Sequence, residues 1–444
     1  MKIQRRFLTY ILALLLISTA IVGIYIRSGG GGEGGKKGEE APIWLTIHYV
    51  AMDNNLDAIG EWQADLHSLQ EVGSTPKSQH VVLYDGDGSN DTVIQYVLQG
   101  EVEEYPPSLI NESWGEEVNM GDGAVLEEFM LWAFERYPAE RVALVLNDHG
   151  GGWRGICWDD TSSDFLSDRE VRGALEGFYR ATGKRVNVLL TYACIMSTLE
   201  FLHAIQPYVD YFVGSQTFSW GSETHGEEYL IGNYPFDKIF GALKERPEMG
   251  AEEFALHIVE SFQPYGPWTA PELYIYRDYT SDTVAAVNLS GIPQLVEAVN
   301  TLGVALHDLL KGPGGPLLRS TIINVVIGSQ QTPPEFNTQA FSGQMDWLGL
   351  ATFTNYDLED FAFRLGRRVP QVNSELVESI QELVEEVVMK CRHGTDPDKG
   401  EHPDAHGISI WIPLRNSEWR ESYTETLFAE ETSWDEFIRE LSRA

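Results

Sequence analysis

The chain has 444 residues, 43% of them apolar and 22% charged, which is too apolar for a disordered chain and long enough for more than one hydrophobic core. It carries 31 Lys and Arg against 67 Asp and Glu, and a net charge of -36 repels phosphate backbones, so we exclude a nucleic-acid partner. The three cysteines, Cys157, Cys194 and Cys391, are too few for a framework of several disulfides, and their spacing matches no zinc ribbon.

The first residues of the chain predict a membrane anchor. Residues 7–26 form a twenty-residue run without a charge, close to the length that a helix needs to cross a bilayer. Lys2, Arg5 and Arg6 precede this run, so the positive-inside rule places residues 1–6 in the cytoplasm and the rest of the chain outside the cell. We therefore predict a single-pass signal anchor in the cell membrane and leave open whether this helix is cleaved.

A glycine-rich segment follows the anchor. Residues 27–41 have too few apolar side chains to bury, and we expect a flexible linker there. Apolar strand-like runs then alternate with helical patterns as far as residue 281, which predicts an α/β domain over 42–281 with a mostly parallel sheet flanked by helices. Longer helices after that point predict a smaller α+β unit over 282–444.

The periodicity predicts the following elements. The strands are expected at 43–50, 80–84, 141–146, 186–190, 211–214 and 407–412. The helices are expected at 56–72, 125–134, 167–179, 197–205, 292–310, 357–368 and 374–390, with a last one from Trp434. Ser167, followed three residues later by Glu170, is typical of a capping box.

Two of the predicted strands end in chemically reactive side chains. The strand at 141–146 leads to His149, and the strand at 186–190 leads to Cys194, 45 residues further on. Ligands bind beyond the carboxyl ends of strands in open α/β sheets, and a cysteine beside a histidine is a nucleophile for peptide cleavage. We predict His149 and Cys194 as the catalytic pair and the amides of Gly150 and Cys194 as an oxyanion hole. A helix starting at Met196 would favour a thiolate at Cys194.

Each of these motifs also has an ordinary structural interpretation. A cysteine after an apolar strand is often an inert core residue, and the sequence HGGG at 149–152 is often only a turn. The two motifs stand at equivalent ends of two apolar strands, and this coincidence favours the catalytic interpretation.

The sequence resembles the clostripain-type cysteine peptidases, relatives of caspases, legumains and gingipains. Four segments, in the same order along the chain as in the family, carry the resemblance. Tyr49–Leu56 is similar to the family's YMAADNNL motif and Val118–Asp122 to its NMGDP motif. Asp148–Trp153 is similar to DHGGGW, and Ala193–Met196 with Glu200 is similar to DACLM...E. The resemblance covers roughly residues 43–240, with weaker similarity at 357–361 and 407–413. It implies a caspase-like fold, a polypeptide substrate and a catalytic dyad of His149 and Cys194.

The chain departs from the family in the substrate pocket. Family members have an aspartate two residues before the nucleophile, which helps to bind an Arg or Lys side chain, whereas this chain has Tyr192. We therefore predict a primary specificity that is not the usual basic one. Glu223, Glu227 or Glu228 are the alternative source of a carboxylate in the pocket.

A metal site has weaker support in the sequence. The loop Asp85–Asp91 is rich in Asp and Gly, but it lacks the glycine and glutamate that an EF-hand has at its sixth and twelfth positions. We predict no cofactor, with calcium at this loop as the weaker alternative. His402 and His406 are four residues apart, but Pro403 and the absence of an HExxH glutamate argue against a zinc helix.

Three functions follow from these observations. The first is a membrane-tethered cysteine endopeptidase that acts outside the cell. The second is a non-catalytic surface protein that keeps the fold and binds a polypeptide or another ligand. The third is a metal-dependent hydrolase that uses His149 together with one of four neighbouring candidates, namely Asp148, Asp159, Asp160 and His225.

Overall fold

The computed structural model describes residues 42–219, 221–263, 282–329, 354–393, 395–396, 400–401 and 405–443. The predicted cytoplasmic tail, anchor and linker over 1–41 lie outside the described residues. None of the described helices has both the length and the apolar character that crossing a bilayer requires.

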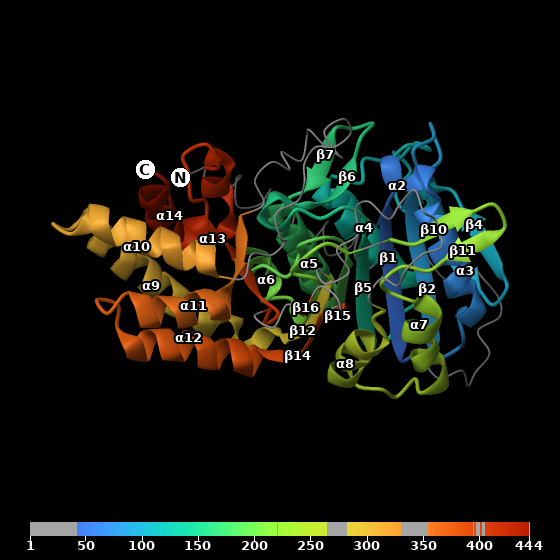
Figure 1. Cartoon of the computed structure of the whole chain (residues 1–444). Helices are drawn as coiled ribbons and strands as arrows, with labels where there is room; N and C mark the ends of the chain where they lie inside the picture. Colours follow the sequence, from blue (N-terminus) through green and yellow to red (C-terminus); the bar gives the residue numbers. More distant parts are fainter. Residues whose placement is uncertain are drawn as a thin grey trace, which may run out of the picture. The chain divides into compact units, whose positions relative to one another are not determined.

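A nine-stranded sheet forms the centre of the fold (Figure 1). Its five central strands are parallel, and two antiparallel strands extend it at each edge. In spatial order the strands are β14 (Val388–His393), β12 (Thr283–Asn288), β9 (Val209–Gly214), β8 (Val186–Tyr192), β5 (Arg141–Asn147), β1 (Trp44–Ala51), β2 (Ser78–Asp85), β3 (Val93–Leu98) and β4 (Glu101–Tyr105). The prediction of an α/β fold with a mostly parallel sheet flanked by helices is confirmed.

The sheet separates two hydrophobic cores, because alternate side chains of a strand point to opposite faces. In β5, Val142 and Leu144 belong to one core, and Ala143 and Val145 belong to the other. The first face is covered by α4 (Gly123–Arg136), α5 (Asp168–Thr182) and α6 (Leu199–Ile205), and the second face by α3 (Glu61–Val72), α7 (Phe236–Glu245) and α8 (Ala251–Ser261).

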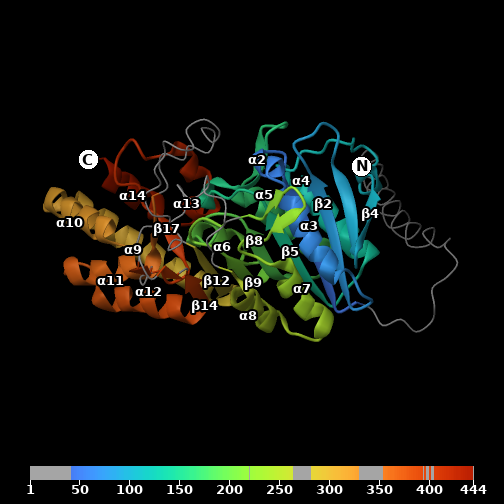
Figure 2. The same ribbon diagram turned by 45° about the vertical axis from the view of Figure 1, so that its right-hand side comes forward.

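The helices that follow β12 in the chain gather beyond the β12 and β14 edge of the sheet (Figures 1 and 2). They are α9 (Ile292–Lys311), α10 (Gly315–Gly328), α11 (Leu358–Arg368), α12 (Ser374–Val387), α13 (Leu427–Glu431) and α14 (Trp434–Ser442). The predicted unit over 282–444 also supplies β12 and β14, so strands from both sides of residue 281 pair in one sheet. The boundary between the two units stays a prediction.

Four two-stranded sheets complete the fold. They pair β6 (Ile156–Asp159) with β7 (Asp164–Leu166), β10 (Glu223–His225) with β11 (Glu228–Leu230), β13 (Asn355–Asp357) with β17 (Ser409–Trp411), and β15 (Thr395–Asp396) with β16 (Gly400–Glu401). The β13 and β17 pair lies against the start of α6, since the Ser409 amide donates to the Ser197 carbonyl over 2.9 Å.

Two predicted helices differ from the structure. The helix expected at 56–72 is divided into α2 (Asn55–Ala58) and α3, because Gly60 between them is left-handed with φ of 71°. The helix expected at 374–390 ends at Val387, because the next residues pair with β12 as β14. The capping box at Ser167 is confirmed, since its side chain accepts from the Glu170 amide and Glu170 reaches back to the Ser167 amide.

Candidate active site

The two reactive motifs meet at the carboxyl edge of the sheet. Strands β5 and β8 are parallel neighbours, and Asn147 lies opposite Tyr192 in their register. The Asp148 amide donates to the Tyr192 carbonyl over 3.3 Å, which extends the contact one residue past β5. His149 and Cys194 each stand two residues after these paired strand ends, so the backbone brings both to one edge of the sheet.

The loop after β5 packs directly against the turn after β8. A side chain at Gly150 would collide with the Cys194 carbonyl oxygen and approach Met196. Gly152 has φ of 63°, and a Cβ there would lie 3.2 Å from the Ile195 carbonyl oxygen. The glycines that follow the histidine are therefore required for the close approach of the two segments.

A neutral imidazole stands at His149. Its Nε2 lies 2.9 Å from Oδ1 of Asn55, the first residue of α2, and the side chain is partly exposed. Desolvation by the surrounding protein lowers the pKa of His149 to about 4. At neutral pH the ring is uncharged and can accept a proton.

Asp148 fixes the loop that carries His149. Its Oδ1 accepts a 2.8 Å hydrogen bond from Nδ2 of Asn54, and its Oδ2 accepts from the Trp158 amide. The side chain is buried, and burial raises the pKa of the Asp148 carboxyl well above its ordinary value. In the sequence Asp148 is a candidate metal ligand, whereas in the structure it links α2, the histidine loop and β6.

The thiol of Cys194 is partly exposed and faces the segment after β9. It lies 3.5 Å from the Ser219 carbonyl oxygen, and its Sγ accepts from the Ser219 amide over 3.4 Å. Burial is the main cause that raises the pKa of Cys194 to about 12, and the Glu61 and Asp148 carboxyls add to it. The prediction that a helix N-terminus favours a thiolate is wrong, because α6 begins only at Leu199.

The turn after Cys194 has a strained backbone. Ile195 is buried and has φ of 62°, a left-handed conformation that is rare for a β-branched residue. Its amide donates to the Thr217 carbonyl over 2.7 Å, and the Ser197 amide donates to the Ser215 carbonyl over 2.8 Å. These contacts hold the turn in place, and such strain is common at functional sites.

Tyr192 is buried and belongs to the core on the α7 face of the sheet. Its ring centroid lies 4.8 Å from that of Tyr234 and 5.9 Å from that of Phe236, and both contacts are edge-on. Burial raises the pKa of the Tyr192 hydroxyl well above its ordinary value, and Asp65 and Glu61 add to the shift.

Two carboxyl groups that the sequence analysis missed lie beside Tyr192. Glu61 and Asp65 are one helical turn apart on α3, and both are buried. Asp65 accepts from the Ser222 hydroxyl and, over 3.3 Å, from Nδ2 of Asn147. Burial raises the pKa of Asp65 to about 7 and that of Glu61 well above its ordinary value. Only the i, i+4 spacing of the two acids on a predicted helix hinted at this pair.

The three glutamates expected near the pocket occupy the β10 and β11 hairpin. Glu223 is largely buried, lies 2.8 Å from Nε2 of His225, and contributes to the raised pKa of Glu61. Glu227 and Glu228 are exposed. Of the three glutamates, Glu223 is the one that the structure places beside the carboxyl pair of α3.

Other residues singled out in the sequence have structural roles. Glu200 is buried, and its Oε1 accepts from the Trp411 amide and the Tyr423 hydroxyl, so it joins α6 to the C-terminal segment. Cys157 is buried, and burial raises the pKa of its thiol well above the ordinary value. His406 lies 2.9 Å from Oδ1 of Asp357, and His402 lies outside the described residues.

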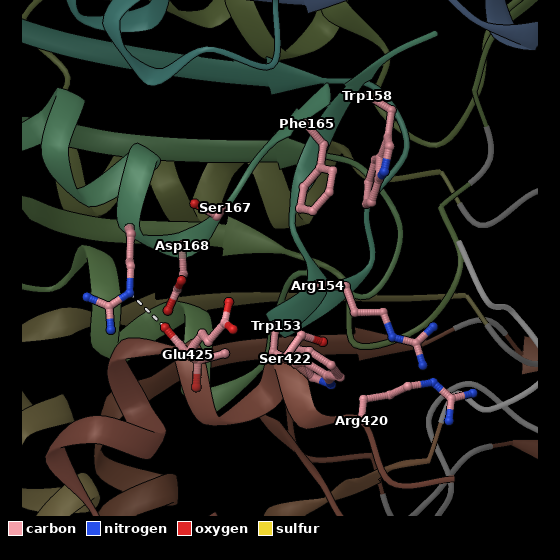
Figure 3. A pocket seen from close by; sticks show the side chains of 11 residues that line it. Trp153, Arg154, Trp158, Phe165, Ser167, Asp168, Arg420, Ser422 and Glu425 are labelled. Carbon is pink, nitrogen blue, oxygen red and sulfur yellow. Dashed lines mark hydrogen bonds between the residues drawn. The ribbon is translucent and has the colours of Figure 1, made fainter. Parts of the chain in front are cut away.

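A cavity of about 400 Å³ lies beside the histidine loop (Figure 3). Three aromatic rings line it, and in Figure 3 the side chains of Arg154 and Arg420 approach each other at one end. The lining residues are Trp153, Arg154, Trp158, Phe165, Ser167, Asp168, Arg169, Arg420, Ser422, Glu425 and Thr426. His149 and Cys194 do not line this cavity, which is therefore separate from the candidate catalytic pair.

Comparisons with known proteins find similarity over most of the chain. The model of the clostripain family matches residues 48–440. Clostripain of Hathewaya histolytica is 30% identical over 232 residues, a match that covers 45% of this chain and 41% of clostripain. The chain thus spans less than half the length of that relative.

Solved structures share the fold. A secreted C11 cysteine protease from Bacteroides thetaiotaomicron, in complex with an irreversible peptide inhibitor, superposes with a TM-score of 0.59 at 16% identity, over 89% of this chain and 99% of that one. An inactive zymogen C11 protease from Parabacteroides distasonis gives 0.58 at 18% identity, over 88% and 99%. With a family model that matches most of its length and the fold of these proteases, the chain belongs to the clostripain family of cysteine peptidases.

Proposed function

We propose that the chain is a cysteine endopeptidase that cleaves polypeptides with His149 and Cys194 as its dyad. The observation that carries the proposal is the register of β5 and β8, which sets both residues two positions beyond paired strand ends. Membership in the clostripain family supports the same reaction.

The charge state of the pair indicates how the reaction begins. The pKa of Cys194 is raised to about 12 and that of His149 is lowered to about 4, so at neutral pH both groups are uncharged at rest. Neutral His149 takes the thiol proton as Sγ attacks the substrate carbonyl carbon, and it then gives this proton to the leaving amine. Water, deprotonated by the same imidazole, hydrolyses the resulting thioester.

Two backbone amides can stabilise the oxyanion of this reaction. Within the part of the chain that the structure describes, the amides of Gly150 and Cys194 donate to no backbone carbonyl. The contact of Gly150 with the Cys194 backbone brings the two segments together, and preorganised N–H donors are effective in such sites.

We propose further that the primary specificity is not limited to Arg or Lys. Tyr192, which stands where the family has its pocket aspartate, carries no charge at neutral pH and packs into the core. The neighbouring Glu61 and Asp65 have raised pKa values, so they tend to hold their protons near neutral pH. To bind an Arg or Lys side chain of the substrate, one of these carboxyl groups would have to ionise. Each unit by which its pKa lies above the pH adds about 1.4 kcal/mol to the cost of that ionisation.

For the location of the enzyme we propose a single-pass anchor over 7–26 with the peptidase outside the cell. The support is the uncharged run and the basic residues before it. Protease added to intact cells should cut the glycine-rich linker and release the peptidase part, while a high-salt wash should not. Recovery of the whole chain in the cytosol would contradict this topology.

Thiol alkylation tests the proposed reaction against the two alternatives. Iodoacetamide should abolish hydrolysis of a mixed peptide library, and the lost activity should follow the modification of Cys194 determined by mass spectrometry. Treatment with a chelator should change neither the identity of the cleavage products nor the residue that iodoacetamide modifies. A binding protein would show no hydrolysis before treatment, and a metal-dependent hydrolase would survive alkylation and lose activity to the chelator.

A further inference from the structure

The cavity shown in Figure 3 combines cationic side chains with aromatic walls. It lies where the histidine loop meets the C-terminal segment: Arg154 ends the short 3₁₀ helix Gly152–Arg154, and Arg420 directly precedes the 3₁₀ helix Glu421–Glu425. Its volume of about 400 Å³ falls within the range of roughly 300 to 1000 Å³ that small-molecule sites have. A cavity of this size, lined by rings and a few charged groups, is typical of a binding site.

Two guanidinium groups come together at one end of the cavity. The side chains of Arg154 and Arg420 approach each other there (Figure 3). Burial lowers the pKa of Arg154 to about 10, and the positive charge of Arg420 adds to this shift. Holding two like charges together in a partly buried place costs free energy, and an anion between them would offset that cost.

The protein orients both arginines. Cζ of Arg154 lies 5.4 Å from the centre of the Trp153 ring, which is a cation–π contact. Nη1 of Arg420 donates to the Ser417 carbonyl over 2.9 Å and to the Trp419 carbonyl over 3.0 Å. A guanidinium group carries five N–H donors in one plane, a geometry that matches a carboxylate. The two arginines therefore form a preorganised end for a carboxylate ligand.

Aromatic rings form the walls beside this cationic end. The rings of Trp158, from β6, and Phe165, from β7, stack with centroids 5.5 Å apart and planes 25° apart. Phe165 is 38% exposed, a large fraction for an apolar ring. The Trp153 ring packs edge-on against Tyr423, with the centroids 5.1 Å apart. An apolar group against these rings would remove apolar surface from water, which is favourable.

The opposite end of the cavity has a different charge. Asp168 and Glu425 lie there, away from Arg154 and Arg420 (Figure 3). Asp168 is buried and accepts from the Leu427 amide over 2.9 Å. These two acids disfavour a second anionic group in the ligand, and the net charge of -36 acts in the same direction. The favoured ligand therefore has one negative charge, next to an apolar part.

We propose that this cavity binds a carboxylate carried next to an aromatic or aliphatic group. The carboxylate lies between Arg154 and Arg420, and the apolar group lies against Trp158 and Phe165. Two sources offer this chemistry: an acidic residue beside an apolar one in a polypeptide, and a small organic acid. Both would use the same contacts.

The cavity shares its wall with the loop that carries His149. Arg154 belongs to that loop, and the Trp158 amide donates to the Asp148 carboxylate directly before His149. Within the loop, the Gly151 amide donates to the Gly155 carbonyl over 2.9 Å. A ligand in contact with both Arg154 and Trp158 would therefore stabilise the loop around the proposed base. This effect on hydrolysis rests on the proposed peptidase function, whereas binding of the carboxylate does not.

Binding can be measured without hydrolysis. The full chain with Cys194→Ala, which leaves the cavity intact and spares the probes from cleavage, is titrated by calorimetry with N-acetyl-Phe-Glu-amide, with its neutral match N-acetyl-Phe-Gln-amide and with 3-phenylpropanoate. The two acids should bind saturably, and the Glu peptide should bind about tenfold more tightly than the Gln peptide. Equal affinities for the two peptides, or no saturable binding of either acid at millimolar concentration, would overturn the proposal.

Matched variants locate the site. Arg420→Gln should weaken binding of the Glu peptide about tenfold and leave that of the Gln peptide unchanged. Arg415→Gln removes the same charge from an exposed position in the same segment, so it should bind as the parent does. An unchanged affinity in Arg420→Gln, or equal losses in the two variants, would overturn the proposal. If Arg420→Gln does not fold, Arg154→Gln replaces it with the same expected result.

Hydrolysis of a peptide library with Glu or Gln at each position separates the two sources. If polypeptides use the cavity, Arg420→Gln should lower kcat/KM about tenfold for Glu peptides relative to their Gln matches, and Arg415→Gln should not. An unchanged profile together with binding of 3-phenylpropanoate would assign the site to a small acid. Binding of the probes to a chain that hydrolyses nothing would leave this inference intact and contradict the proposed function, whereas hydrolysis without probe binding would do the opposite.

Discussion

The ends of β5 and β8 carry the two members of the proposed dyad, yet they are held in different ways. Side chains hold the histidine loop: Asn54 donates to Asp148, and Oδ1 of the next residue, Asn55, lies 2.9 Å from Nε2 of His149. Backbone groups hold the cysteine turn, through the bonds of Ile195 and its neighbours to the segment after β9. The base is therefore sensitive to changes in polar side chains, and the nucleophile is sensitive to changes in backbone conformation.

Removing either member of the dyad should have the largest effect. Cys194→Ala and His149→Ala should each lower kcat/KM by about 10³-fold or more, and the double variant should fall no further because the two groups act as a unit. Hydrolysis rates of a peptide library measure this. Cys391→Ala, which changes another partly buried thiol that donates to the Ala405 carbonyl, should keep the parental rate. A Cys194→Ala variant with near-parental activity would disprove the cysteine mechanism.

Substitution of Tyr192, the last residue of β8, should change which substrate residue is preferred before the cut. Tyr192→Asp should raise kcat/KM for substrates with Arg or Lys before the cut by about two orders of magnitude relative to uncharged residues, because a buried ion pair with one partner missing costs about 3 to 5 kcal/mol. Profiling the parent and the variant on one peptide library measures the change. A parent already strict for Arg or Lys would contradict the proposed specificity.

The Glu61→Gln variant tests whether Glu61 is the source of any preference of the parent enzyme for Arg or Lys before the cut. If Glu61 stays protonated when substrate binds, this isosteric change should leave the profile unchanged, since the raised pKa of Glu61 keeps the carboxyl neutral. A loss of cleavage after Arg or Lys in Glu61→Gln, with Glu227→Gln as the exposed control, would show that α3 supplies the charge instead.

The pH dependence of the reaction should report the unusual state of His149. Because its pKa is lowered to about 4, the base stays deprotonated above that value, and kcat/KM should fall only as the pH drops through about 4. Asn55→Ala removes the partner of Nε2, so kcat should fall about tenfold with little change in KM. Asn373→Ala, at the start of α12, is a control that should leave kcat unchanged. An acid limb near pH 6.5 in the parent would contradict this account of the site.

The sequence predicted the parts of the molecule that depend on local patterns. The central parallel strands, most helices and the equivalent placement of His149 and Cys194 follow from apolar periodicity and from the position of reactive residues after strands. Strands β12 and β14 were not predicted as partners, because their pairing depends on distant segments of the chain. Glu61 and Asp65 were missed for the same reason, because α3 meets Tyr192 only through the packing of distant segments of the chain.

The smallest expected effect tests the backbone of the cysteine turn. Ile195→Ala and Ile195→Gly remove nearly the same buried side chain, so their difference in stability reports mainly on backbone conformation. Alanine is usually more stable than glycine by about 0.5 to 1 kcal/mol, but at a φ of 62° the order should reverse by about 1 kcal/mol. Urea unfolding of the two variants measures this difference. The same pair at Met196, a buried neighbour with negative φ, should keep the usual order, with alanine the more stable. If alanine were the more stable residue at both positions, the left-handed turn at Ile195 would be wrong.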